Sequence, residues 1–339
     1  MPMGIRHGHV EREGEGEGEG AGLNWKEQGV PDNLDVICAL LDGNDRIEYQ
    51  EKLEQLKKES LEFWEFETVP YVFKQSATDT DDTKFDYLRD HFGKLKPWKE
   101  ILDQLEKLND DSGEDEVYKL AFLARHGQGY HNQAHAKYGN DAWNDYWSKI
   151  NGDGELVWGP DPELTHLGVS QAVENHDQWE IELRDESKIL PHKWYSSPFT
   201  RSIDTLIGTW NGIVDLKQVK PLVLEDLRET IGIHTCDKRS TKSIIASKYQ
   251  SKGFVLEEGF EEEDIYWKPD VRELIAEQAI RINRSFQNIF TSTSKNDSII
   301  SITSHSGSIR AQLLVLGHRS FAVGTGGMIP VFIKAKKKI

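Results

Sequence analysis

A short apolar run that ends in a polar pair is the first place where this sequence could do chemistry. The run from Leu120 to Ala124 has the composition of a fully buried parallel strand, and Arg125 and His126 follow it directly. Gly127 then permits a tight turn. Because open α/β sheets bind ligands beyond the carboxyl ends of their strands, this pair is well placed for catalysis. Such a triplet also occurs by chance, so other parts of the chain must supply partner groups.

The same triplet occurs again as Arg6, His7 and Gly8, which provides an internal comparison. No strand-like run precedes it, and residues 11–20 after it alternate glutamate and glycine with one arginine. A segment of this composition cannot bury a core, so we expect residues 1–26 to form a disordered acidic tail. The second triplet is therefore not part of the predicted site.

Three further strand-like runs lead to polar side chains that could join Arg125 and His126. In a parallel sheet with aligned carboxyl ends, such side chains can converge on one pocket although they are far apart in sequence. The runs and the residues that follow them are His192–Ser197 with Arg201, Pro221–Leu224 with Glu229, and Ser298–Thr303 with His305.

Two arginines and two histidines around one point would bind an anion strongly. Guanidinium groups match the spacing of phosphate oxygens, and a histidine can donate a hydrogen bond from either ring nitrogen. One histidine could also act as a nucleophile, which requires a carboxylic acid to protonate the leaving oxygen. Glu229 is the best candidate for that acid, although Glu225 and Asp226 lie close to it in the sequence.

Strand-like and helix-like segments alternate along the chain, which predicts an α/β fold with a mostly parallel central sheet and helices on both faces. The Trp- and Gly-rich region from Tyr138 to Pro162 is expected to be an ordered loop with one helical turn. The other expected elements are a helix over Trp98–Leu108, a helix capped by Thr165 that runs through Gln171 toward Trp179, a helix over Ile309–Leu316 closed by Gly317, and a final strand over Ile329–Ala335.

An N-terminal extension is expected to precede the catalytic domain. The pattern from Asn33 to Lys58 predicts one or two surface helices, and the aromatic cluster from Phe63 to Phe73 is expected to pack on the main domain. We place the extension at residues 27–116 and the catalytic domain at residues 117–339.

The composition is that of a soluble globular protein, with 339 residues, 37% hydrophobic residues and a mean hydropathy of −0.62. No apolar run approaches the roughly 20 residues needed to span a bilayer. Met1 to Gly8 lack the apolar core of a signal peptide. Cys38 and Cys236 are too few for a disulfide framework, which favours a reducing compartment. We expect the protein in the cytoplasm, and a nuclear location stays open as well.

The net charge of −17 argues against binding to nucleic acid, whose phosphates attract clustered lysines and arginines. We expect neither a nucleic-acid partner nor a membrane partner, and the sequence does not predict an oligomeric state. An acidic protein can still bind a small anion where arginines gather locally. A small phosphorylated substrate is therefore compatible with the overall charge.

The polar residues after the strand-like runs resemble the motifs of the histidine phosphatase (phosphoglycerate mutase-like) superfamily. Within it, the sequence is similar to the fungal phosphomutase-homologue branch and its plant relatives, from about Phe63 to the C-terminus. The superfamily motifs are Arg125–Gly127, Ser196–Arg201, Glu229 and Ser304–Gly307, and the branch motifs are Arg125–Asn132, Trp158–Pro162 and Glu229–Arg239.

The resemblance implies a role for each of these residues. His126 would be the nucleophile and become phosphohistidine, while Arg125, Arg201 and His305 would hold the transferred phosphoryl group. Asn132 matches a further phosphate contact of the family. Glu229 would protonate the leaving group and then activate water. Neither a metal nor another cofactor is expected, because two arginines and a histidine can balance the charge on the phosphoryl oxygens.

Four neighbouring residues are open to two interpretations. They could line the pocket for the leaving group, or they could belong to an ordinary surface loop. They are His131, His234, Lys238 and Arg239. Cys236 has no cysteine or paired histidine at metal-ligand spacing, so we predict no metal site.

The combined interpretation is a phosphomonoester hydrolase that acts on a small phosphorylated substrate through a phosphohistidine intermediate. A phosphoglycerate mutase-type phosphotransferase is the alternative within enzymes, because it would use the same groups while keeping water away from the phosphoenzyme. A pseudophosphatase that serves as a scaffold is the alternative outside them. The loss of a catalytic residue would support the scaffold, but the sequence retains all the residues that carry the predicted chemistry.

Overall fold

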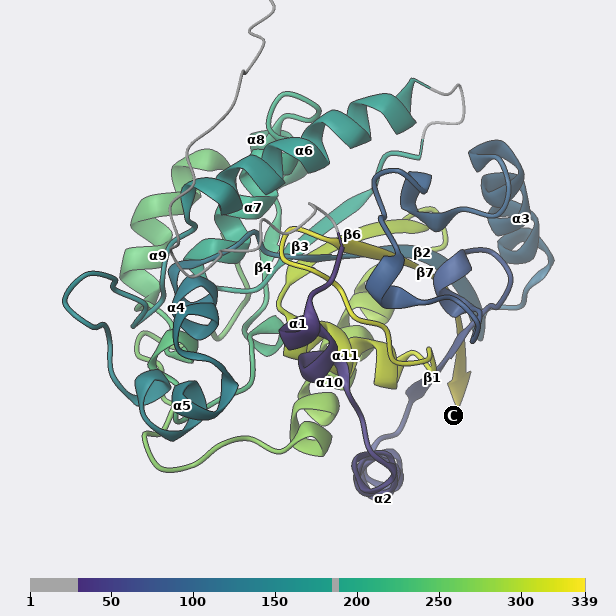
Figure 1. Ribbon diagram of the computed structural model, residues 1–339. Coiled ribbons are helices and arrows are strands. Elements are labelled where there is room, and N and C mark those ends of the chain that lie inside the picture. Colours follow the sequence, from purple (N-terminus) through teal and green to yellow (C-terminus); the bar gives the residue numbers. More distant parts are fainter. Residues whose placement is uncertain (1–29, 185–188, 339) are drawn as a thin grey trace, which may run out of the picture.

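Within the described residues, a sheet of seven strands forms the centre of the protein (Figure 1). The computed structural model describes residues 30–184 and 189–338, so the expected acidic tail and its Arg-His-Gly triplet lie outside the described residues. The strands are β1 (Phe63–Thr68), β2 (Glu116–Arg125), β3 (Lys193–Ser196), β4 (Leu222–Val223), β5 (Val255–Leu256), β6 (Ile299–Ser304) and β7 (Met328–Lys338).

The sheet is mostly parallel, as the sequence predicts. Its strand order is β1-β7-β2-β6-β3-β4-β5, and β7 alone runs antiparallel to both of its neighbours. The centre is strongly apolar: Leu120 and Phe122 of β2, with Ile300 and Ile302 of β6, are 0% exposed. Strands that are covered on both faces read as continuous apolar runs, which is why β2 and β6 are visible in the sequence.

The helices cover both faces of the sheet, which confirms the predicted fold class (Figure 1). Two long helices pack together on one face and two others pack together on the opposite face. These are α6 (His166–Leu183) with α7 (Thr200–Trp210), and α10 (Ile275–Ser292) with α11 (Ser306–Val315). The remaining helices are α1 (Asn33–Ala39), α2 (Gly43–Glu59), α3 (Trp98–Asp111), α4 (Tyr130–Tyr138), α5 (Asn140–Asp145), α8 (Leu216–Val219) and α9 (Lys242–Tyr249).

The register of the central strands brings their carboxyl ends to one edge. Arg125 at the end of β2 lies opposite Ser304 at the end of β6. Ser196 at the end of β3 lies opposite Thr303, one residue earlier on β6. The residues that follow these strands therefore start from neighbouring points, and this edge positions the candidate site.

Several expected elements are present with small shifts in their bounds. The Thr165 side chain caps α6 by accepting a hydrogen bond from the Gly168 amide, as predicted. Gly317 follows α11 with a φ of +64°, a left-handed conformation that favours glycine and ends the helix. The predicted third strand shrinks to the two residues of β4.

The expected loop over Tyr138 to Pro162 is more helical than predicted. It contains α5 and a short turn at Trp147–Lys149, and α4 directly precedes it. The tryptophans of this region give it a core of its own, in which Trp143 and Trp158 pack with Ala134 and Cys236. Tryptophans that bury one another can order a segment whose sequence has no clear helical period.

The N-terminal extension is joined to the main sheet. Its aromatic cluster includes β1, an edge strand that pairs antiparallel with β7, and β1 was not foreseen as a strand. The predicted helical segment forms α1 and α2, which pack on α11 and α10 respectively. The expected boundary near residue 117 falls at the start of β2, and β1 lies before it in the same sheet. Among the described helices, none is long and apolar enough to cross a membrane.

Candidate active site

His126 directly follows β2, and the backbone carbonyl group of the next residue, Gly127, holds its ring in one orientation. Its Nδ1 atom lies 2.6 Å from the carbonyl oxygen of Gly127. A carbonyl oxygen can only accept a hydrogen bond, so Nδ1 carries the hydrogen and Nε2 keeps its lone pair. The side chain is 2% exposed. Nε2 is therefore the ring nitrogen of His126 whose lone pair is available.

The turn after His126 is packed too tightly for a larger residue than glycine. A Cβ atom on Gly127 would lie 2.2 Å from the carbonyl oxygen of Gly168 at the start of α6. The Gly127 amide also donates a 2.9 Å hydrogen bond to the Thr205 hydroxyl of α7. This close approach fixes the turn between two helices and thereby fixes His126.

Arg201 reaches the same place from the first turn of α7. It is 0% exposed, and its Nη1 donates to the carbonyl oxygen of Cys236 at 3.0 Å. Its Nη2 donates to the carboxylate of Asp237 at 3.3 Å. The start of α7 is itself fixed by buried Asp161, which accepts hydrogen bonds from the amide and hydroxyl of Thr200 at 2.9 Å.

His305 follows β6, and its ring centre lies 5.0 Å from that of His126. Its Nε2 atom is 2.7 Å from the hydroxyl of Ser197 and 3.3 Å from that of Ser202. We assign the Ser197 hydroxyl as the donor to Nε2, since the Ser202 hydroxyl donates to the carbonyl oxygen of Ser304. This leaves the hydrogen of His305 on Nδ1, where it can donate to a ligand.

Buried polar atoms without partners mark the centre of the group. Among the described residues, the Nε atoms of Arg125 and Arg201 and the Nδ1 atoms of His131 and His305 are buried and make no hydrogen bond. A buried, unsatisfied polar atom is unfavourable, so several around one point indicate a site for an anionic ligand.

The histidines of this group are held neutral. Burial lowers the pKa of His126 well below its usual value, and the positive charges of Arg201 and Arg125 lower it further. Burial and Arg201 lower the pKa values of His131 and His305 in the same way. A neutral imidazole at position 126 is the form that can attack phosphorus.

Glu229 faces the start of α11. One carboxylate oxygen accepts a 3.1 Å hydrogen bond from the Gly307 amide, and the other accepts a 2.9 Å hydrogen bond from the Thr230 amide. A Cβ atom on Gly307 would lie 2.2 Å from this carboxylate. Glycine at position 307 thus allows the carboxylate to sit against the helix that follows His305.

A cavity of about 500 Å³ lies above these residues, and we call it the catalytic cavity. His126 is not part of its lining, but His131 is, and the two rings lie 5.3 Å apart. The predicted site residues that line the cavity are Arg125, His131, Asn132, Glu229 and His234. The Asn132 side chain also accepts a 2.9 Å hydrogen bond from the Gly129 amide, which fixes it at the start of α4.

Lys238 and Arg239 do not line the catalytic cavity. Lys238 is exposed and lies over the ring of Trp267, at 5.2 Å. Arg239 is buried and pairs with Glu225 at 2.7 Å, while its other nitrogens donate to backbone carbonyl oxygens. Of the four residues left open by the sequence, the structure therefore brings only His131 and His234 to the cavity.

One group of side chains in the described residues has the spacing of metal ligands, namely His234, Cys236 and Asp237, whose donor atoms lie within 4.8 Å of one another. The Asp237 carboxylate already pairs with Arg272 at 2.8 Å and with Arg201. Burial raises the pKa of Cys236 well above its usual value, which keeps the thiol protonated. Two arginines and a neutral thiol disfavour a cation there, so these residues do not fit a metal site.

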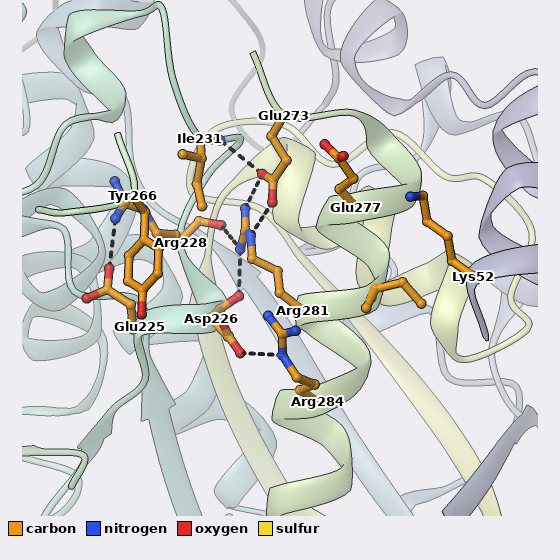
Figure 2. A pocket seen from close by; sticks show the side chains of 11 residues that line it. Lys52, Glu225, Asp226, Arg228, Ile231, Tyr266, Glu273, Glu277, Arg281 and Arg284 are labelled. Carbon is orange, nitrogen blue, oxygen red and sulfur yellow. Dashed lines mark hydrogen bonds and ion pairs between the residues drawn. The ribbon is translucent and has the colours of Figure 1, made fainter. Parts of the chain in front are cut away.

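A second cavity, of about 670 Å³, is lined by Arg228 and Ile231, which lie on either side of Glu229 in the sequence, and by residues of α10 (Figure 2). Arg281 of α10 crosses it and donates to the backbone carbonyl oxygens of Asp226, Arg228 and Glu229. Glu273 pairs with the same guanidinium at 2.6 Å. Figure 2 shows Arg281 joined to Glu273 and to the backbone that precedes Glu229, so we call this the scaffold cavity.

Several residues that support the site were not foreseen. Asp161 lies in a recognised motif, but only the structure shows that it fixes the start of α7. Ser197, which contacts His305, lies in a recognised motif as well. Arg281 and Asp35 had no motif to mark them, because their contacts join segments that are distant in the sequence.

Comparison with known proteins agrees with this geometry. Residues 121–322 match the family described as histidine phosphatase superfamily (branch 1). A probable phosphoglycerate mutase of Arthroderma benhamiae is 37% identical over 288 residues, which cover 79% of this chain and 84% of that protein. A probable phosphoglycerate mutase of Saccharomyces cerevisiae is 34% identical over 274 residues, 75% of this chain and 89% of that protein.

A third relative, phosphomutase-like protein 3 of Candida albicans, is 39% identical over 216 residues, which cover 63% of this chain and 65% of that protein. The resemblance to the fungal branch that the sequence motifs indicated is thus confirmed. This chain belongs to the histidine phosphatase superfamily.

Proposed function

We propose that this protein is a phosphomonoester hydrolase that acts through phosphohistidine at His126. The observation that carries the proposal is the set of buried atoms without partners around that side chain, which a phosphoryl group would satisfy. Neutral Nε2 of His126 would attack phosphorus, and Arg201 and Arg125 would balance the charge on the phosphoryl oxygens.

Glu229 would move the protons of the reaction. As Nε2 forms its bond to phosphorus, the bond from phosphorus to the leaving oxygen breaks and Glu229 donates a proton to that oxygen. Water then attacks phosphorus, Glu229 takes the proton from water, and the bond from phosphorus to Nε2 breaks. Inorganic phosphate is released and His126 returns to its neutral form.

The position of Glu229 supports this role. It lines the catalytic cavity, where a leaving group would lie, and it rests on the Gly307 amide two residues after His305. An acid placed between the cavity and the phosphoryl site can reach the bridging oxygen. Arg281 holds the backbone of Glu229 from behind at 2.8 Å.

A phosphotransferase of the mutase type is the second candidate, because two of the relatives carry the name of phosphoglycerate mutases. It would use the same phosphohistidine but return the phosphoryl group to an organic hydroxyl. Assays with 3-phosphoglycerate separate the two: release of inorganic phosphate supports the hydrolase, and formation of 2-phosphoglycerate supports the mutase. The cytoplasmic or nuclear location stays a prediction.

Trapping the intermediate tests the proposal. Brief exposure of the protein to a radiolabelled aryl phosphate, followed by a denaturing quench, should leave acid-labile label on the wild type and none on His126→Ala. His166→Ala is the matched control, because His166 is exposed at the start of α6 and should not change labelling. Labelling that persists in His126→Ala would refute the proposed intermediate.

A further inference from the structure

The first helix of the N-terminal extension lies at the catalytic cavity. The sequence predicted only a surface helix here, but Leu34, Asp35, Ile37 and Cys38 of α1 line the cavity together with Glu229. One turn of helix from outside the family-matched residues 121–322 therefore forms part of the cavity wall.

Asp35 joins this helix to Arg125. Its carboxylate is 4% exposed, and one oxygen accepts a 2.5 Å hydrogen bond from Nη1 of Arg125. The other oxygen accepts a 2.8 Å hydrogen bond from the Asp32 amide, which closes the capping box of α1. The same carboxylate thus starts the helix and binds the arginine of the Arg-His-Gly motif.

The contact uses the edge of Arg125 that a phosphoryl group does not need. Nη1 also donates to the carbonyl oxygen of Val323 at 2.8 Å, so both of its hydrogens are engaged. Nε of Arg125 is buried and has no partner among the described residues. Because a guanidinium binds phosphate through two parallel N–H groups, the edge that contains Nε remains for the ligand.

The other end of α1 is tied to the active site as well. Arg310 of α11 donates from Nη1 to the carbonyl oxygen of Cys38 at 3.2 Å. Since α11 begins directly after His305, α1 bridges the element that carries His126 and the element that carries His305.

We propose that Asp35 is a positioning residue for phosphoryl transfer, delivered by the N-terminal extension, which orients Arg125 so that its Nε edge faces the phosphoryl group. The inference rests on the proposed phosphoryl-transfer function. The extension is then a part of the active site and not an appendage to the catalytic domain.

The contact between Asp35 and Arg125 also has an opposite interpretation, in which Asp35 acts as a plug that blocks the phosphate site. A carboxylate bound to an active-site arginine could occupy the place of phosphate and inhibit the enzyme. The two interpretations predict effects of opposite sign: removing a positioning carboxylate weakens phosphate binding and catalysis, whereas removing a plug strengthens both.

The chain offers a matched control in α2. Asp45 closes the capping box of α2 as Asp35 does in α1, accepting a 2.9 Å hydrogen bond from the Asp42 amide at an exposed position. Asp35→Asn and Asp45→Asn remove the same charge from the same place in a helix cap. They differ in the contact with Arg125.

The experiment measures aryl phosphate hydrolysis, inhibition by inorganic phosphate and thermal unfolding for the full chain and both variants. We expect Asp35→Asn to lower kcat/KM and to weaken phosphate inhibition, each by about tenfold or more, because a small misplacement of a binding group has effects of that size. Asp45→Asn should match the wild type within about twofold. Asp35→Glu, which keeps the charge, should recover part of the loss.

Three results would overturn the proposal: higher activity in Asp35→Asn, unchanged phosphate inhibition in it, or equal losses in both variants. If Asp35→Asn fails to fold, Asp35→Ser serves in its place, because a hydroxyl can still cap α1 but cannot neutralise Arg125. A wild type that neither hydrolyses phosphomonoesters nor binds phosphate would refute the proposed function instead.

Discussion

The catalytic cavity and the scaffold cavity are both rich in charged side chains, but they differ in how these are paired. In the scaffold cavity, Arg281 is bound by Glu273 and by three backbone carbonyl oxygens. Beneath the catalytic cavity, Arg125, Arg201 and His305 each keep one buried atom without a partner in the described residues.

The difference shows that pairing identifies a ligand site better than size does. The two cavities are of similar size, at about 670 Å³ and about 500 Å³, yet the arginines of the scaffold cavity, Arg228, Arg281 and Arg284, each pair with a carboxylate. A buried donor without a partner is unfavourable until a ligand satisfies it. Among the described residues that line the scaffold cavity, one such atom is present, the Nε of Arg228, whereas Arg125, Arg201, His131 and His305 each contribute one at or beneath the catalytic cavity. More unsatisfied binding capacity therefore lies at the catalytic cavity. Arg281 connects the two regions by holding the backbone of Glu229.

Replacing one arginine from each region should give the largest contrast. We expect Arg201→Ala to lower kcat/KM by about 10³-fold, since removing one preorganised donor from a charged transition state has effects of this order. Arg284→Ala should stay within about twofold, because Arg284 lines the scaffold cavity and its side chain is 54% exposed. Steady-state hydrolysis of an aryl phosphate measures both, and comparable losses would remove the distinction between the cavities.

Glu229→Gln tests the chemical role of Glu229, whose side chain lines the catalytic cavity and whose backbone is bound by Arg281. We expect a loss of about 10²-fold with alkyl phosphates and a much smaller loss with an aryl phosphate, whose leaving group needs little protonation. The same variant assayed with both substrates provides its own control. Equal losses would mean that Glu229 is not the acid and that the proton comes from another group in the cavity.

The residues beneath the catalytic cavity were largely predictable because they lie at or just after the ends of apolar strands. Arg125 ends β2, His126 follows it, and His305 follows β6, so the sheet register brings together residues that the motifs identify separately. Local pattern sufficed for these positions. The fold class followed from the same alternation of strands and helices.

The residues that hold these side chains in place, Asp35 and Arg281, were not predictable from the sequence, for two reasons. Asp35 and Arg281 act through contacts with residues that are distant along the chain, and a charged residue in a helical pattern reads as a solvated face. The helix α10 itself could have been found, because Ala279, Ile282 and Phe286 recur at helical spacing and are 0% exposed.

Arg281→Lys changes the scaffold cavity and should thereby lower kcat at the catalytic cavity, by less than Arg201→Ala or Glu229→Gln does. Lysine keeps the charge beside Glu273, but its three N–H donors cannot replace the five hydrogen bonds of Arg281, two to Glu273 and three to carbonyl oxygens. The segment that carries Glu229 should therefore loosen. We expect kcat to fall about tenfold with an alkyl phosphate and less with an aryl phosphate. Arg284→Lys is the control, and equal behaviour of the two variants would show that Arg281 does not position Glu229.

The smallest expected effect is on the pH dependence of the free energy of unfolding, to which the buried histidines beside the catalytic cavity contribute. Burial lowers the pKa of His131 well below its usual value, so its unfolded form binds a proton below about pH 6.5 while its folded form does not. Stability is therefore lost as pH falls through that range, by up to about 1.4 kcal/mol per pH unit for this one group. Burial raises the pKa of Glu257 to about 7, which opposes the trend, so the measurable quantity is a difference between variants.

Urea unfolding of the wild type and His131→Gln between pH 7.5 and pH 5.5 provides that difference. We expect the free energy of unfolding of the variant to fall less on acidification than that of the wild type. The difference should be at most that linked to one proton, about 1.4 kcal/mol per pH unit. Saturating inorganic phosphate should also flatten the wild-type profile, because an anion among the unpaired donors favours the protonated histidines. Phosphate that leaves the profile unchanged would show that the ligand binds away from these histidines.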